Sequence, residues 1–243
     1  MTVLFRHSLR EVAISIAGLF RFKGMFKGSY IILLLPFFLA WCLILFPALF
    51  GHHHHELIGS WQGFESWLIM IIAMMWPLLI VPALAVTQRS LSMRSTRNTA
   101  MMTIGYGTVW AATALPAWIV LTAYDYLHFD PRIGTLIGCI IAAVWQVSPL
   151  KRDLALKCNP TPHFPNDNSK RLISMFSFGA KFAKQCVLST FLLMVPPMFG
   201  GHGILLMGIL LILMMAERAI STPDFRMSAI ILIGYGISTF LLS

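Results

Sequence analysis

The first residues that could do chemistry are four consecutive histidines, His52, His53, His54 and His55, which Glu56 follows directly. Neutral imidazole and carboxylate groups suit copper, zinc or nickel. Neighbouring imidazoles in one loop can capture a metal ion, but they do not enforce one coordination geometry. The run therefore indicates metal capture at most, and a solvated loop of titratable residues explains it equally well.

A second candidate is the segment 124–130, which reads Tyr-Asp-Tyr-Leu-His-Phe-Asp. If the preceding helix continues through it, Asp125 and His128 share a face at a spacing of i, i+3. One metal ion could then bind there, with His202 or the four-histidine run completing its ligands. An aromatic belt with a polar turn is the better interpretation, because tyrosine is common at membrane interfaces and a helix ends readily at Asp130-Pro131.

Methionines form the third candidate. Met70, Met74 and Met75 lie in one apolar run, and the i, i+4 spacing of Met70 and Met74 turns both thioethers to the same side of a helix. A thioether is a soft ligand that suits Cu(I). Methionine also fills irregular gaps in apolar cores, and spacing alone favours this packing role.

The four cysteines are Cys42, Cys139, Cys158 and Cys186, and no two of them form a C-x-x-C pair. A zinc knuckle or a thioredoxin-like motif is therefore not encoded. The sequence also contains no phosphate-binding loop, no G-x-S-x-G, no H-E-x-x-H and no nucleophile beside an evident base. We therefore expect a protein that is not an enzyme.

The elements that must position these residues are membrane-spanning helices. Hydrophobic residues make up 58% of the 243 residues and charged residues 11%, whereas a soluble domain has roughly 45–50% and about 25%. This composition excludes an ordinary soluble enzyme, a disordered chain and a disulfide scaffold. The net charge of +9 fits basic loops beside a lipid bilayer better than a nucleic-acid partner. We predict an all-α, polytopic transmembrane bundle, located in a bacterial inner membrane.

Seven apolar runs are long enough to be considered as spans: 30–50, 66–87, 100–123, 133–149, 185–200, 203–217 and 227–242. Residues 1–29 read as an amphipathic helix on the cytoplasmic surface, and 172–184 as a second interfacial helix. Pro196, Pro197 and the glycines after them predict a tight hairpin between the fifth and sixth runs. The predicted organisation is a cytoplasmic segment, 1–29, followed by a transmembrane helical domain, 30–243.

The distribution of charge predicts the orientation. With the N-terminus inside, 17 of the 18 lysines and arginines fall on the inner side and only Arg132 falls outside. Most histidines, including the run at 52–55, His128 and His202, then fall outside. We therefore predict a cationic inner face and place the histidine-rich loop on the outer, periplasmic side.

Glu217 is the ionisable residue closest to an apolar interior, because it closes the sixth run. A buried charge is costly in lipid and is usually paired. Glu217 could pair with Lys151 or Arg152 near the inner surface. A place in the headgroup region is the simpler interpretation.

The order of several motifs resembles a bacterial family of predicted metal-binding integral membrane proteins of unknown function, some of whose members are linked to copper delivery to a membrane-associated tyrosinase. The resemblance covers about 65–243. The motifs are Trp67-x-x-Met70-x-x-Ala73-Met74-Met75-x-Pro77, then Gly105-Tyr106-x-x-Val109-Trp110, then Trp145-Gln146-x-Ser148-Pro149-Leu150-Lys151-x6-Cys158, and finally Gly179-Ala180-x5-Cys186.

The resemblance also implies thiols that this chain lacks. Leu154 stands where the family has a cysteine four positions before Cys158, and Phe182 and Gln185 stand where further cysteines are expected. If those thiols bind metal in the family, a remaining site would depend on Cys158, Cys186 and the methionines. This chain is thus identified as a divergent member.

The leading functional prediction is a copper-handling membrane protein, a carrier or a metallation factor for a partner membrane oxidase. Copper would be captured at the four-histidine run and relayed through His128, His202 and the methionines. One alternative is a metal-free accessory subunit of a multi-subunit membrane complex. Another is a membrane copper enzyme with Asp125, His128 and His202 as ligands at the outer interface.

Overall fold

The computed structural model describes residues 27–50, 61–90, 92–126, 130–156, 165, 167–199, 204–219 and 225–242. Within these ranges every regular element is a helix and no strand occurs. The all-α prediction is therefore confirmed for the described part of the chain. The division into 1–29 and 30–243 stays a prediction, because residues 1–26 lie outside these ranges.

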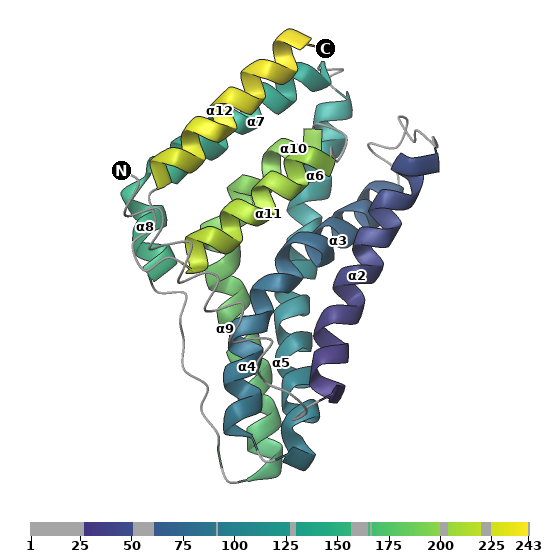
Figure 1. The fold of residues 1–243 in the computed structure, drawn as a ribbon, viewed down its shortest axis with the longest axis vertical. Coiled ribbons are helices and arrows are strands. Elements are labelled where there is room, and N and C mark those ends of the chain that lie inside the picture. Colours follow the sequence, from purple (N-terminus) through teal and green to yellow (C-terminus); the bar gives the residue numbers. More distant parts are fainter. Residues whose placement is uncertain are drawn as a thin grey trace.

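Eleven α-helices and two 3-10 turns follow one another along the described chain, and Figure 1 shows their arrangement. They are α2 (Lys27–Phe50), α3 (Trp61–Met75), the 3-10 turn η1 (Trp76–Leu79), α4 (Ile80–Arg89), α5 (Ser92–Ala112), α6 (Ala114–Tyr126), α7 (Pro131–Val147), α8 (Pro149–Leu156), α9 (Asn168–Thr190), the 3-10 turn η2 (Phe191–Met194), α10 (Val195–Phe199), α11 (Ile204–Ala219) and α12 (Phe225–Leu242).

Three of the described helical stretches are long and apolar enough to cross a membrane, judged by length and composition: Trp67–Thr87, Arg94–Tyr124 and Lys170–Phe199. Four shorter apolar helices coincide with other predicted runs: Leu33–Leu45, Pro131–Val147, Ile204–Glu217 and Phe225–Leu241. The prediction of seven spans is therefore not supported at that number. It located the apolar helices, but it counted runs that are shorter than a bilayer requires.

The boundary predicted between an interfacial helix at 172–184 and a span at 185–200 is wrong. A single helical stretch runs from Asn168 through η2 to Phe199. Lys181 and Lys184 do not end it, because both are exposed while Phe178, Phe182 and Cys186 are buried on another face. Pro196 and Pro197 also lie inside this stretch, within α10.

Prolines reshape the helices without ending them. Pro77 lies in η1, and it has no N–H to donate to the carbonyl of Ala73. The indole of Trp41 on α2 donates to that Ala73 carbonyl at 3.1 Å. In the same way Trp145 on α7 donates at 3.1 Å to the carbonyl of Ser189, just before η2. The irregular turns therefore expose carbonyls that aromatic donors from other helices satisfy.

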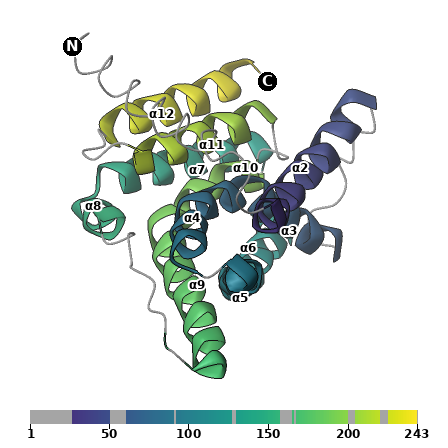
Figure 2. The ribbon, with the colours of Figure 1, turned by 60° about the horizontal axis from the view of Figure 1, so that its bottom comes forward.

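Two glycines allow α5 and α9 to cross in backbone contact. A Cβ on Gly105 would lie 2.2 Å from the carbonyl oxygen of Phe176, and a Cβ on Gly179 would lie 2.0 Å from that of Met102. Small residues permit such close helix crossings in membrane proteins. Figure 1 shows the two helices side by side, and Figure 2 shows α5 nearly end-on beside α9.

A second group of helices packs around α7. Helices α7 and α12 lie side by side along one edge of the molecule, and α10 also packs on α7 (Figure 1). Gly236 on α12 faces Cys139, and Gly138 on α7 faces the backbone of Pro196. Helix α11 contacts both α12 and α3, so it connects the helices around α7 with α3.

Candidate functional site

Met75 is the last residue of α3, directly before η1, and a side chain of α5 forms a hydrogen bond with its backbone. The Tyr106 hydroxyl donates to the carbonyl oxygen of Met75 at 3.0 Å. Met70, Met74 and Met75 are all fully buried. The predicted methionine group is thus inside the protein, as both the packing and the ligand interpretations require.

Thr190 connects Met75 with Cys186. Its hydroxyl lies 2.7 Å from the carbonyl oxygen of Cys186 and 3.8 Å from the sulfur atom of Met75. Cys186 is fully buried, and it precedes Thr190 by one helical turn on the same face of α9. We refer to Met75, Cys186 and Thr190 as the sulfur centre. One hydroxyl there contacts the thioether of Met75 on α3 and the backbone carbonyl of Cys186 on α9.

Aromatic rings pack around Tyr106, which contacts Met75 of the sulfur centre. The Tyr106 ring lies 5.8 Å from the ring of Phe182 and 6.4 Å from that of Trp110, measured between centroids. All three side chains are nearly or fully buried. The family resemblance implies a cysteine at the position of Phe182, so an aromatic ring lies here in place of the expected thiol. A dry surrounding of this kind suits soft sulfur ligands.

Several predicted metal ligands cannot be compared with the structure. The four histidines at 52–55, His128, Cys158 and His202 lie outside the described residues, and the side chain of Asp125 does too. Among the residues that are described, no group of three or more His, Cys, Asp or Glu side chains could hold a metal ion.

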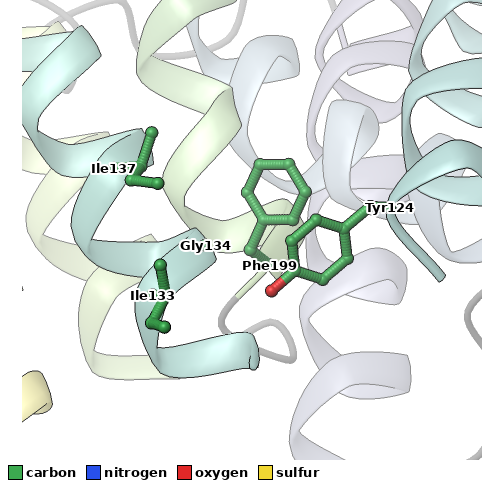
Figure 3. Close-up of a pocket in the computed structure, with 5 residues that line it drawn as sticks. All are labelled: Tyr124, Ile133, Gly134, Ile137 and Phe199. Carbon is green, nitrogen blue, oxygen red and sulfur yellow. The ribbon is translucent and has the colours of Figure 1, made fainter. Parts of the chain in front are cut away.

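The end of α6 carries apolar packing. The Tyr124 hydroxyl donates to the Asp130 carbonyl at 2.6 Å, and the Asp130 carboxylate accepts from the Arg132 amide at 2.9 Å and caps α7. Figure 3 shows the cavity beside Tyr124, of about 140 Å³, which Ile133, Gly134, Ile137 and Phe199 also line. The bond from Tyr124 and the cap by Asp130 form a polar turn, whereas the metal prediction for Asp125 and His128 stays a prediction because both side chains lie outside the described residues.

A closed polar cluster lies where α7 meets α8 and α11 ends. The Lys151 ammonium lies 2.7 Å from one carboxylate oxygen of Glu217 and also donates to the amide oxygen of Gln146. The Gln146 amide nitrogen donates to the other Glu217 oxygen at 2.6 Å. Lys151 is 1% exposed, and its ammonium lies 4.8 Å above the Phe225 ring. Of the two interpretations of Glu217, the structure supports pairing with Lys151.

Thr190 and Gln146 are the residues that sequence reasoning missed. Thr190 follows Cys186 at i, i+4, a spacing that could have drawn attention to a shared helix face. Gln146 was only part of a motif, and its bridging role depends on Glu217, 71 residues later. The roles of both residues depend on tertiary contacts with residues far away in the sequence.

One comparison with known proteins found a related family. A family model, PpoB2, described as a copper chaperone, matches residues 64–239. The matched range contains the sulfur centre and the polar cluster. The match confirms the expected link to copper delivery, whereas the link to a tyrosinase stays a prediction. No curated protein and no solved structure gives a significant match to the chain.

Proposed function

Because the chain belongs to the copper chaperone family PpoB2, we propose that it binds copper within a membrane and delivers it to a partner protein. The recipient would be a membrane oxidase. The chain would carry the ion without transforming a substrate, and the sulfur centre would be the place where copper is held. Copper is the cargo in this proposal.

The observation that carries the proposal is that the Thr190 hydroxyl lies 3.8 Å from the Met75 sulfur atom and 2.7 Å from the backbone carbonyl oxygen of Cys186. Thioether and thiolate are the protein ligands that Cu(I) prefers. Met75 on α3 and Cys186 on α9 each supply one sulfur group, and both residues are fully buried. Buried sulfur donors suit Cu(I) better than zinc or magnesium. Family membership further favours copper handling over a metal-free accessory subunit.

We also propose the orientation predicted from the charges. The ends of α4, α5 and α9 carry exposed basic residues, among them Arg89, Arg94, Arg97 and Lys170, and they would lie on the inner side. The four-histidine loop would then capture copper on the outer side. From there the ion would travel inward to the methionines.

Copper content is the direct test of the sulfur centre. The detergent-purified protein, reconstituted with Cu(I), would be measured by mass spectrometry as wild type, Met75→Leu and Cys186→Ser. Met227→Leu and Cys42→Ser are matched controls, because both side chains are exposed. We expect near-stoichiometric copper in the wild type and the controls, and a clear loss in both centre variants.

The same measurement distinguishes the copper-holding role of the sulfur centre from the copper-capturing role of the outer loop. Replacing His52–His55 with alanine should slow loading from dilute copper but leave the capacity at saturation unchanged, since the loop captures and the centre holds. Wild-type protein without copper above background would overturn the proposal and favour the accessory subunit. Equal loss in the exposed controls would show that the substitutions act on folding.

A further inference from the structure

The cavity beside Tyr124 has an apolar lining. The side chains that line it end in carbon, except for the Tyr124 hydroxyl, and that hydroxyl donates to the Asp130 carbonyl at 2.6 Å. Apolar cavities of about 150 Å³ stay dry in other proteins and take up small hydrocarbons such as benzene. The volume of about 140 Å³ therefore suits a short stretch of hydrocarbon, and the lining favours it over a polar molecule.

Gly134 leaves room at the floor of this cavity. A Cβ at Gly134 would lie 2.6 Å from the Tyr124 hydroxyl oxygen, closer than such atoms approach. The rings of Tyr124 and Phe199 lie together, with centroids 4.5 Å apart, across from Ile133 and Ile137 in Figure 3. The cavity thus lies between the start of α7 and the ends of α6 and α10.

The mouth of the cavity continues into an exposed apolar face of α7. Ile133 and Ile137 line the cavity, yet they are 41% and 49% exposed. Exposed side chains follow at i+7, i+8 and i+11 from Ile133, spacings that keep them on the same helix face: Ile140, Ile141 and Val144. If α7 lies in a membrane, this face contacts acyl chains, so a lipid chain is the hydrocarbon most available to the cavity.

A basic residue lies beside the mouth. Arg132 directly precedes Ile133 and is exposed. Its backbone amide donates to the Asp130 carboxylate at 2.9 Å, so Asp130 already caps α7 and the Arg132 side chain is the group that could bind an anion. In the proposed orientation, Arg132 is the one outer residue among the 18 lysines and arginines. Guanidinium groups bind phosphate through paired hydrogen bonds.

We propose that Arg132 and the cavity together form a binding site for one phospholipid, with the phosphate at Arg132 and part of one acyl chain between Tyr124, Ile137 and Phe199. This inference rests on the membrane location in the proposed function and adds a ligand other than copper. Both parts of the site lie in the first two turns of α7, where the chain carbons nearest the headgroup would be. A lipid bound there contacts α6, α7 and α10 and stabilises their packing.

Native mass spectrometry of the detergent-purified full chain would measure the binding. The three probes are phosphatidylglycerol, diacylglycerol with the same chains, and inorganic phosphate. Ile137→Trp fills the mouth of the cavity, and Arg132→Gln removes the charge. Ile141→Trp and Arg152→Gln are the matched controls, because both positions are exposed and neither lines the cavity.

We expect the wild type and both controls to bind one phosphatidylglycerol. Ile137→Trp should weaken binding by about tenfold or more, since excluding two methylene groups from an apolar site already has about that effect. Arg132→Gln should weaken it by about fivefold, the effect of one basic residue beside an anionic lipid surface. Diacylglycerol should bind the wild type about fivefold more weakly than phosphatidylglycerol does, and inorganic phosphate alone should not bind.

Equal affinity of Ile137→Trp and Ile141→Trp for phosphatidylglycerol would overturn the site for the chain. Equal affinity of Arg132→Gln and Arg152→Gln, or binding of phosphate alone, would overturn the joint site for phosphate and chain. Arg132 is exposed, so this second comparison holds even if tryptophan at position 137 perturbs packing. Copper content of the same samples keeps the two proposals apart: wild type that binds copper but no lipid overturns this inference alone, and wild type that binds lipid but no copper overturns the copper-handling function alone.

Discussion

At the scale of single residues, the backbone of Met75 depends on one hydroxyl group. The 3-10 turn that Pro77 imposes replaces the regular i→i−4 bonding of the helix. The Met75 carbonyl accepts from Tyr106 at 3.0 Å. As the N-cap residue of η1, Met75 also accepts the first backbone bond of the turn, so Tyr106 adds a second hydrogen bond that stabilises both the turn and the methionine.

We therefore expect Tyr106→Phe to lower the free energy of unfolding by about 0.5–1.5 kcal/mol, the net contribution of one hydrogen bond. Unfolding by SDS in mixed detergent micelles would measure it. Tyr126→Phe is the control, since Tyr126 is 82% exposed, and it should change stability by less than about 0.5 kcal/mol. Equal stability of Tyr106→Phe and wild type would contradict the assigned role of this hydrogen bond.

The sequence identifies ligand types at this scale but not their partners. Met75 and Cys186 were recognisable because sulfur is a soft ligand wherever it lies in the chain. Thr190 was not, because a threonine in an apolar helix is common and its contact with Met75 spans 115 residues. Local spacing can relate Thr190 to Cys186, because both lie on one helix. It cannot predict the contact with Met75 on α3.

At the scale of elements, the crossing of α5 and α9 positions the sulfur centre, since Tyr106 on α5 contacts Met75 while Cys186 and Thr190 lie on α9. Gly105 and Gly179 would each place a Cβ within 2.2 Å of a backbone oxygen of the other helix. Backbone atoms cannot move aside as the end of a side chain can. The two helices would have to separate to admit a methyl group.

Gly105→Ala and Gly179→Ala should each destabilise the protein by about 1–3 kcal/mol or more, the usual cost of overpacking. Gly107→Ala is the control on the same helix, because a Cβ there meets nothing within 4 Å. It should be neutral or stabilise by up to about 1 kcal/mol through helix propensity. Thermal denaturation in detergent would compare the three, and a Gly105→Ala protein as stable as Gly107→Ala would refute the close crossing.

Helix positions were predictable from the sequence to a greater extent than helix ends. Apolar runs revealed α2, α7, α11 and α12 because burial in lipid or protein requires them. The break between α5 and α6 at Thr113 was missed, although Pro116 removes the N–H that would reach Ala112. Lys181 and Lys184 suggested a boundary in α9, where the charges merely lie on an outward face.

At the scale of the whole molecule, the longest helical stretches exceed what a bilayer needs. Arg94–Tyr124 has 31 residues and Lys170–Phe199 has 30. A helix of this length extends about 45 Å, whereas the hydrocarbon core is about 30 Å thick. If both cross the membrane, their basic first turns would project beyond the hydrocarbon core, and in the orientation proposed above they would do so on the inner side. The crossing of α5 and α9 would then lie near that inner surface.

The polar cluster of Gln146, Lys151 and Glu217 holds the second group of helices together, because it joins the α7–α8 junction to the end of α11. Its charges and amide groups satisfy one another. Removing one member of a buried ion pair leaves the other charge without compensation, which costs about 3–5 kcal/mol. The cluster therefore makes the arrangement of these helices depend on both charges being present.

We expect Lys151→Met to lower the unfolding free energy by about 3–5 kcal/mol. Arg152→Met is the matched control, because the neighbouring Arg152 is exposed, and it should remain within about 0.5 kcal/mol of the wild type. Adding Glu217→Gln to Lys151→Met should restore part of the loss, since the carboxylate no longer needs a counter-charge. SDS unfolding of all four proteins would measure the coupling, and equal effects of Lys151→Met and Arg152→Met would show that the ion pair does not hold α11 to α7 and α8.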